Sequence, residues 1–401
     1  MAQNNRIFYA CQAVAFRPMG DGTAASYVVA HGVQSVGITT NFNLEQAFEL
    51  GQVQIYENIE GLPDVECTLE KVLDGYPLLY HLASMGAESA GLVGRSKERA
   101  DCALAIYSDG QDSVNDGGQT KPSTTVYMSG MYLNSVSYTI STDGNATESV
   151  TLVGNHKEWI KFDDASQAKT INKTTHTGPA GFGLTGGNPD YPTAYEGGSG
   201  GVQRRENVLL KDSIMPESLF GNLCGTIAGN ANQTISDTGN AYDTSSKMPK
   251  IHVQSFSVST DFGREDILEL GRKSPYFRAP NFPIEVTSEL EAMAVSGDFV
   301  GAYEFGDPDL FNTNASGDNT SEEYILITLK AGIMFDMGAN NRLSSVSYGG
   351  GDAAGGNATI SYSYTNFNEL TVVHSGDPAW TGNGGTMNYS PDQSGILLVG
   401  L

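Results

Sequence analysis

The most constraining feature of this sequence is an internal repeat with an offset of about 220 residues. Residues 33–63 align without a gap to residues 253–283, with 11 identical residues in 31 positions. A second pair of segments, 133–138 and 343–348, follows in the same order. A repeat of this length is too long for a solenoid unit. Two separated matches in the same order therefore predict two copies of one globular module within the 401 residues.

Each copy has the pattern of a β module. Segments 64–70 and 284–291 alternate apolar and polar residues, which is typical of strands with one buried face. The 48 glycines indicate many tight turns. Helix is predicted only over residues 77–85, where Pro77 lies near a first turn and Gly86 follows the last apolar residue. The sequence therefore predicts a mainly β chain of two tandem antiparallel β-sandwich or partial-barrel modules, with a short helix in the first.

The predicted modules are separated by a segment of different composition. Residues 163–206 are rich in Gly, Thr and Asn and contain few apolar residues, which is typical of a linker or a long surface loop. We therefore expect a first module over residues 1–162 and a second over residues 207–401. The second copy has no clear counterpart of the predicted helix.

The charge balance excludes one class of partner. The chain has 46 acidic and 22 basic residues, giving a net charge of -24. Binding to nucleic acid by counterion release needs clustered Lys and Arg, so it is not expected here. High acidity by itself also serves solubility. The first residues lack the apolar run of a secretory leader, and no stretch is long and apolar enough to cross a membrane, so we expect synthesis in the cytoplasm.

Motifs for catalysis or for metal binding are weak. The four cysteines form no C-x-x-C pair and are expected to be buried in a reducing compartment. The six histidines never fall at ligand spacing on one element. Residues 181–186 match the dinucleotide-binding string G-x-G-x-x-G, but they lie in a polar loop and lead into Pro189, so no helix can start there. We predict no catalytic residue, cofactor or metal, and a protein that is not an enzyme.

The order of the repeated segments carries a resemblance. A strand over residues 36–42 leads through Glu-Leu-Gly at 49–51, repeated at 269–271, to Leu62-Pro63 and a second strand, then to the helix and a hairpin over 135–153. This order is similar to the tail tube proteins of long-tailed bacteriophages, and in particular to the variant with two tube modules in one chain.

The resemblance implies a structural virion protein. Three chains would form a pseudo-hexameric ring, and stacked rings would form the hollow tail tube that delivers phage DNA without binding it specifically. The implied partners are further copies of the chain, the tape-measure protein, the baseplate and the tail terminator. The implied location is the phage tail, after synthesis in the host cytoplasm, with no membrane contact.

Other functions are compatible with the same module. The chain could be another ring-forming virion component, such as a baseplate or tail terminator protein, or a tube protein similar to that of type VI secretion. A secreted β-sandwich adhesin or carbohydrate-binding protein is disfavoured because the sequence begins without a leader.

The repeated residues are those of strands and turns. We expect the two glycines to permit turns and the aromatic pairs to pack in cores or interfaces; these positions are Phe42, Gly51, Tyr56, Phe262, Gly271 and Tyr276. Four repeated acidic residues are candidates for a lumen or for contacts between subunits: Glu45, Glu49, Glu265 and Glu269. Strand residues are equally good candidates for an acidic lumen, namely Glu66, Glu70, Glu289 and Glu291.

Overall fold

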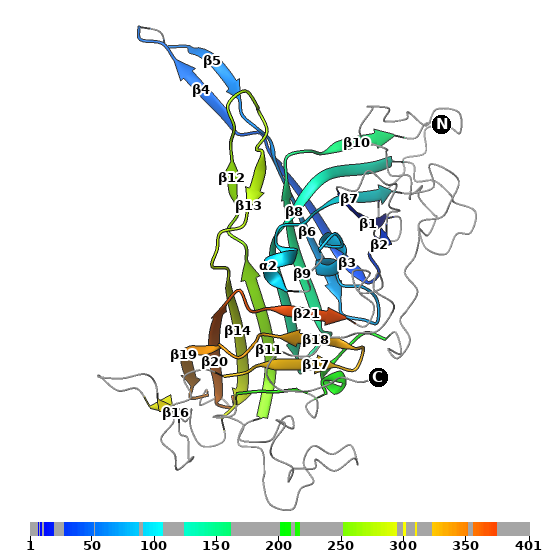
Figure 1. Ribbon diagram of the computed structural model, residues 1–401, viewed down its shortest axis with the longest axis vertical. Helices are drawn as coiled ribbons and strands as arrows, with labels where there is room; N and C mark the ends of the chain where they lie inside the picture. Colours follow the sequence, from blue (N-terminus) through cyan, green and yellow to red (C-terminus); the bar gives the residue numbers. More distant parts are fainter. Residues whose placement is uncertain are drawn as a thin grey trace, which may run out of the picture.

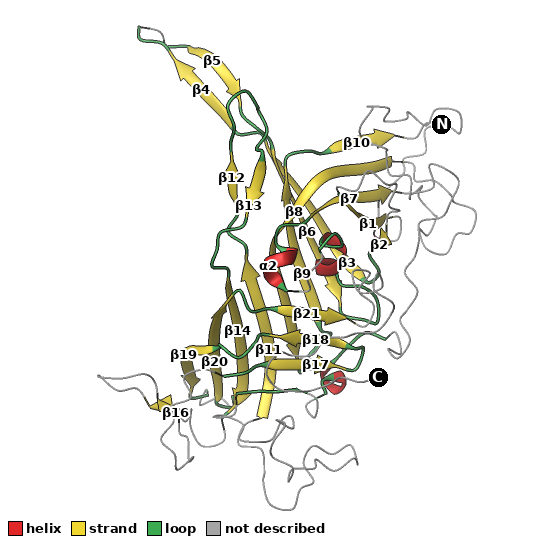
Figure 2. Ribbon diagram, viewed as in Figure 1, coloured by secondary structure: helices red, strands yellow, loops and turns green. Residues whose placement is uncertain are grey.

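Antiparallel strands make up most of the structure. The computed structural model describes residues 7, 9, 12–19, 28–51, 53–87, 91–106, 124–161, 201–209, 213–216, 252–294, 300–301, 309–310, 323–351 and 356–374. Among these residues the strands pair antiparallel throughout, and only two short α-helices occur (Figures 1 and 2). The prediction of a mainly β fold is confirmed. Most of the predicted linker at 163–206 lies outside the described residues.

One sheet runs through both copies of the repeat. Its strand order is β3 (Val33–Asn41), β6 (Asp64–Val72), β9 (Thr147–Gly154), β8 (Thr124–Ser141), β11 (His252–Asp261), β14 (Glu285–Met293), β20 (Thr359–Phe367) and β19 (Arg342–Gly349). The first four strands come from the first copy, and the last four come from the second. In Figure 1 they stand side by side along the long axis of the molecule. The two modules are therefore joined by backbone pairing between β8 and β11.

A second layer covers one face of this sheet. In the first copy, the early part of β8 pairs with β7 (Arg99–Ile106) and β10 (Glu158–Lys161), and β7 pairs with β1 (Gln12–Pro18), which also pairs with β2 (Val28–Val29). In the second copy this layer is β17 (Leu326–Leu329), β18 (Ile333–Asp336) and β21 (Thr371–His374), which run across the direction of the long sheet strands in Figure 1. One hydrophobic core lies between the layers and extends through both copies, including Phe16, Leu69, Leu152, Phe256, Phe335 and Tyr362.

Two sequence-based boundaries differ from the structure. A single strand is expected over residues 324–334, but Gly332 has a φ of 77°, and a turn there divides the segment into the hairpin of β17 and β18. The predicted helix is present as α1 (Leu79–Ala83), whereas α2 (Leu92–Arg95) is not expected from the sequence. α2 has four residues, too few for a 3.6-residue pattern to identify it.

The repeated strands follow the same path in both modules. In the β3–β6 ladder Ser35 lies opposite Glu70, and in the β11–β14 ladder Ser255 lies opposite Glu291. Both ladders are interrupted at the residue before these serines, so the irregularity is repeated as well. The β8–β9 and β19–β20 ladders also break at matching positions, after Leu133 and after Leu343.

Each module also has a hairpin that extends beyond the sheet. β4 (Leu44–Phe48) pairs with β5 (Ile55–Glu60), and β12 (Glu265–Ile267) pairs with β13 (Phe277–Ala279), at the upper end of Figure 1. Pairing of Glu45 with Ile59 corresponds to pairing of Glu265 with Ala279, so an offset of 220 residues holds for both strands of the hairpin. The turn glycines Gly51 and Gly271 have φ values of 92° and 85°, a left-handed conformation that glycine adopts without steric cost.

Smaller elements complete the description. β15 (Val300–Gly301) pairs with β16 (Asp309–Leu310), and a short 3-10 helix, η3, spans Arg205–Asn207. Just before η3, the backbone N–H of Gln203 donates to the carbonyl of Leu73, and the N–H of Ala146 donates to Gln203. The end of the predicted linker therefore lies against the first module.

Arg264 fastens the second module to the first. Its guanidinium donates hydrogen bonds to the carbonyl oxygens of Leu133 (2.6 Å), Ser96 (2.6 Å) and Arg278 (2.9 Å). It also lies over the ring of Tyr132, 5.0 Å from the ring centroid. Burial lowers the pKa of Arg264 to about 10, far above neutrality, so the side chain is charged.

We predict that Arg264→Leu lowers the free energy of unfolding by about 2–4 kcal/mol, since carbonyl groups at the junction lose a charged donor. Chemical denaturation measures the loss. Arg272→Leu is the matched control, because Arg272 is half-exposed and its contact with Glu269 is 3.8 Å long, so its loss should cost under about 0.5 kcal/mol. Equal losses in the two variants would contradict the assignment of Arg264 as the fastening residue.

Candidate assembly surface

The seam between the modules is a ladder of backbone hydrogen bonds between β8 and β11. It pairs Ser141 with Ser255 at one end and Ser135 with Asp261 at the other. Beyond the strand ends, the N–H of Thr142 donates to Gln254 and the N–H of Phe262 donates to Asn134, at 2.9 and 2.8 Å. The facing backbone edges of β8 and β11 are therefore hydrogen-bonded to each other and are not open to another chain.

β3 is the counterpart of β11 in the first module, but its outer side is open. Within the described residues β3 pairs only with β6, so one side of its backbone faces outward. The side chains follow this difference. Phe42 is 63% exposed, whereas its counterpart Phe262 is fully buried; Ile38 is half-buried, whereas Val258 is buried. The first module therefore exposes a strand edge that the second module covers.

β19 is the counterpart of β8, and its outer side is open too. In the described part of the chain it pairs only with β20. Tyr348 on β19 is 54% exposed, whereas the equivalent Tyr138 on β8 is 1% exposed. The sheet therefore ends in two edges, β3 and β19, which correspond to the two sides of its own internal seam.

Among the described residues, the face of the sheet away from the second layer is lined by small hydroxyl residues and carboxylates. Ser and Thr alternate with core residues on most of its strands, for example Ser35, Thr68, Ser149, Ser137, Ser257, Thr287, Ser361 and Ser347. β6 contributes Glu66 and Glu70 to this face, and β14 contributes Glu289 and Glu291. The eight strands contain only two basic residues, Arg342 and Lys71, and Lys71 is buried. The face is therefore acidic, with carboxylates from both modules.

The hairpins expose apolar side chains. Every residue of β5 is exposed, and large apolar side chains occur on both hairpins, including Leu44, Phe48, Leu50, Ile55, Leu268 and Leu270. A two-stranded hairpin is marginally stable alone, and exposed apolar patches of this kind mark contact surfaces. The hairpins are candidates for contacts with another molecule.

The residues singled out from the sequence separate into three places. Phe42 lies at the open edge, and Phe262 lies in the core beside the seam. Tyr56 and Tyr276 are exposed on the two hairpins. The four repeated acidic residues also lie on the hairpins, not on the polar face of the sheet: Glu45, Glu49, Glu265 and Glu269.

Sequence reasoning missed the features that make the seam. The edges depend on which strand pairs with which, and a single sequence does not reveal this. The sequence signal at Arg264 is weak: Leu44 occupies its position in the first copy, but 20 of the 31 aligned positions differ between the two copies.

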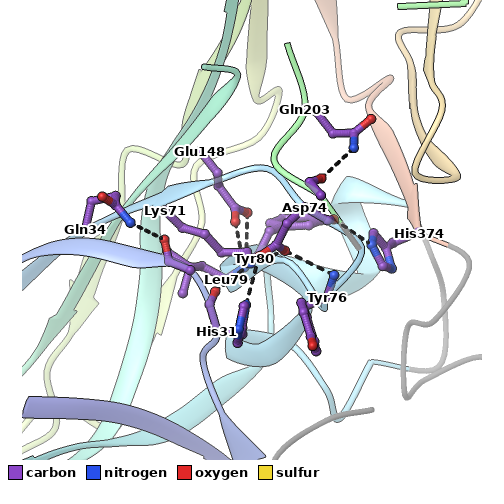
Figure 3. Close-up of polar contacts among 12 residues, drawn as sticks. His31, Gln34, Lys71, Asp74, Tyr76, Leu79, Tyr80, Glu148, Gln203 and His374 are labelled. Carbon is purple, nitrogen blue, oxygen red and sulfur yellow. Dashed lines mark hydrogen bonds and ion pairs between the residues drawn. The ribbon is translucent and has the colours of Figure 1, made fainter. Parts of the chain in front are cut away.

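A buried polar cluster, shown in Figure 3, lies at the end of β6 that is farther from the β4–β5 hairpin. Lys71 is fully buried, and its ammonium donates to Asp74 at 2.7 Å and to the carbonyl of His31 at 2.6 Å. The His31 ring lies 2.9 Å from the second oxygen of Asp74 and stacks on Tyr76. Burial alone would raise the pKa of Asp74, but His31, Lys71 and the N–H of Tyr76 together lower it below its usual value.

Glu148 fixes the start of α1 in the same region. Its carboxylate accepts hydrogen bonds from the N–H groups of Leu79 (2.7 Å) and Tyr80 (3.0 Å) and from the hydroxyl of Tyr138 (3.1 Å). Burial raises the pKa of Glu148, and these backbone donors oppose the rise. The group is enclosed in the protein core, so a structural role is favoured over catalysis.

The same region connects the first module to the end of the second. His81 lies 2.9 Å from the carbonyl of Val372, and His374 lies 3.4 Å from the carbonyl of Asp74. These contacts fasten β21 to the first module. They hold the two modules in one body at the end away from Arg264.

The described residues contain no group of three His, Cys, Asp or Glu side chains placed to hold a metal ion. Cys67 and Cys102 are free and buried, as predicted for the cysteines, while Cys11 and Cys224 lie outside the described residues. In the same portion of the chain, no helix is long and apolar enough to span a membrane.

Comparison with known proteins gives distant structural neighbours only. No family model and no curated protein matches this sequence. Three solved structures each align with about two fifths of this chain. The anti-feeding prophage tube-terminating cap is 15% identical over 40% of this chain and 95% of its own, with a TM-score of 0.29, and the anti-feeding prophage baseplate is 12% identical over 40% and 98%, with a TM-score of 0.28. The PVC sheath-tube complex of an extracellular contractile injection system is 17% identical over 39% of this chain and 93% of its own, with a TM-score of 0.27. These neighbours are parts of tail-like assemblies.

We predict that Asp74→Asn lowers the free energy of unfolding at pH 7 by about 3 kcal/mol or more, because buried Lys71 loses its charged partner. The lowered pKa of Asp74 also makes part of the stability depend on pH. That part is present above the unfolded pKa, near 3.8, and is lost as the pH falls through the folded value.

Urea denaturation at pH 7 and at pH 3 tests this prediction. The variant should lose less stability between these two pH values than the unmodified protein. Asp143→Asn, in the exposed turn after β8, should behave like the unmodified protein at both pH values. An acid dependence that is unchanged in Asp74→Asn would contradict the prediction.

Proposed function

We propose that this protein is a structural tail protein whose copies pair edge to edge into a ring, and whose rings stack into a hollow tail tube. The observation that carries the proposal is the match between the open edges and the internal seam. β3 and β19 are the counterparts of β11 and β8, which already pair with each other inside the chain. An exposed strand edge is a template for pairing with another chain, and closing a ring removes every such edge.

The internal seam specifies the register of the proposed contact. Ser259 lies opposite Ser137 in the β8–β11 ladder, so Thr39 of one copy should lie opposite Ser347 of the next. Likewise Ile38 should lie opposite Tyr348, which would cover the half-buried and exposed side chains of the two edges. If the contact between chains repeats the rotation that relates the two modules within a chain, the chains close into a ring in which first and second modules alternate.

Three copies per ring follow from the resemblance to two-module tail tube proteins, since six modules would then surround the channel. The second layer covers one face of the sheet, so the polar face is the one available to line the channel. Its carboxylates would repel DNA and its lack of Lys and Arg would avoid attachment to phosphates. A net positive lining in the structure of an assembled ring would contradict this part of the proposal.

The hairpins are proposed to make the axial contacts. They extend beyond the end of the sheet, and their exposed apolar residues need cover. A partner at this position would be the adjacent ring, or the baseplate and the tail terminator at the ends of a tube. Electron microscopy of the purified protein tests this part. Single rings that never stack would indicate one of these other ring-forming components and not a tube protein.

We predict that Thr39→Cys combined with Ser347→Cys gives covalent multimers on mild oxidation. The N–H of Phe262, just after β11, donates to Asn134, and the carbonyl of Gln254 accepts from the N–H of Thr142, so the even-numbered residues of β11 form the hydrogen-bonded pairs with β8. The Ser259–Ser137 pair therefore belongs to the closer, non-hydrogen-bonded class, and its counterpart across the proposed contact should be close enough for a disulfide. Non-reducing gel electrophoresis measures the product, and microscopy records rings.

The matched control is Ser35→Cys combined with Ser347→Cys. Ser35 lies four residues from Thr39 on the same strand and the same face, too far from Ser347 for a disulfide in the proposed register. Similar cross-linking in both pairs would refute the register. Monomers alone, in every condition and with no cross-linking, would refute the proposed function.

A further inference from the structure

A hollow on the second module lies beside the open edge of β19. It is lined by Asn340, Arg342, Thr365, Phe367 and Glu369, at the end of the sheet nearest the hairpins. Arg342 is exposed there, and Glu369 is hydrogen-bonded to Asn340. Arg342 is the only exposed Lys or Arg in the eight strands of the sheet, as described above.

The equivalent place in the first module is already filled. Tyr132 stands at the position of Arg342, because the β8–β9 ladder pairs Tyr132 with Val153 and the β19–β20 ladder pairs Arg342 with Thr365. Tyr132 is 6% exposed. The base of the β12–β13 hairpin covers it: Phe277 packs edge-on with 5.7 Å between the ring centroids, and the Arg264 guanidinium lies over the ring, 5.0 Å from its centroid.

The hairpin of the first module carries different residues at these two positions. With the offset of 220 residues that holds for both hairpin strands, Phe277 corresponds to Glu57 and Arg264 corresponds to Leu44. Glu57 and Leu44 are both exposed. If two copies pair as the internal seam does, Glu57 of one copy comes to Arg342 of the other, and Leu44 comes to the aliphatic part of the same side chain.

We propose that this hollow is the binding site for the base of the β4–β5 hairpin of a second copy, with a Glu57–Arg342 ion pair at its centre. The inference rests on the edge pairing proposed above and names the side chains that select the partner. An aromatic pair within the chain is replaced by an oppositely charged pair between chains, at the same place in the repeat. Tyr132 is replaced by Arg342, and its contact Phe277 is replaced by Glu57. The two positions change together, as expected for side chains that contact each other.

The exchange gives the two kinds of seam different properties. The seam within a chain is held by Tyr132, Phe277 and Arg264, whereas the seam between chains would depend on a partly exposed ion pair. Salt screens exposed ion pairs, so a ring should separate between chains before the modules separate within a chain. The charged pair also disfavours a wrong alignment, in which Arg342 would meet Arg264, a charge of the same sign, at the hairpin base of the second module.

Charge reversal tests the pair. Arg342→Glu and Glu57→Arg should each weaken ring formation by about tenfold or more, and the double variant should recover most of the loss, because the charges are exchanged and the pair is restored. Sedimentation velocity at low and at 0.5 M salt, a concentration near which screening reaches only about 3–5 Å, measures the ring fraction. Arg205→Glu combined with Glu206→Arg is the matched control, since both residues are exposed on η3, and it should form rings normally.

The outcomes separate this inference from the proposed function. Rings that form equally well in both single variants overturn the ion pair but leave the edge pairing intact. Single variants that fail with no recovery in the double variant also overturn it, because the two residues then act separately. Absence of rings and of the Thr39–Ser347 cross-link in the otherwise unmodified protein overturns the proposed function and this inference with it. Thermal melting of each variant shows that the chain is folded.

Discussion

The backbone ladder between β8 and β11 is the interaction on which the rest of the structure depends. It converts two modules into one sheet, extends one hydrophobic core through both, and buries residues such as Tyr138 and Val258. Side chains reinforce it at both ends: Arg264 near the hairpins, and His81 with His374 at the other end. A sheet joined in this way must still end somewhere, and it ends in β3 and β19, the counterparts of the joined pair in the repeat.

The differences between the copies are therefore as informative as the identities. Phe42 and Phe262 are the same residue in the same place, and their exposure differs because only one has a module beside it. Leu44 and Arg264 differ in type because one hairpin base packs within the chain and the other faces outward. An assembly in which every position had the same neighbour would not require such differences. They fit a ring with two kinds of seam.

Much of the fold could be predicted from the sequence, because the alternation of apolar and polar residues in β6, β14 and β20 follows directly from one buried face. The turn glycines were also predictable, since Gly51 and Gly271 need positive φ values. The split between β17 and β18 was not, because a continuous apolar run gives no period. The candidate surface was predicted only in part: the strand glutamates lie on the polar face, whereas the repeated glutamates of the hairpins do not.

The sequence by itself determined that the chain is mainly β and that strands and turns recur in the same order, since alternation, turns and repeat order can be read without knowledge of contacts. Only the tertiary structure decided which strands meet. Backbone hydrogen bonds carry no side-chain identity, so no residue pattern states that β11 pairs with β8 or that β3 and β19 stay open. For the same reason the partners of Arg264, Lys71 and Glu148 became visible only when strands and loops distant in sequence were placed side by side.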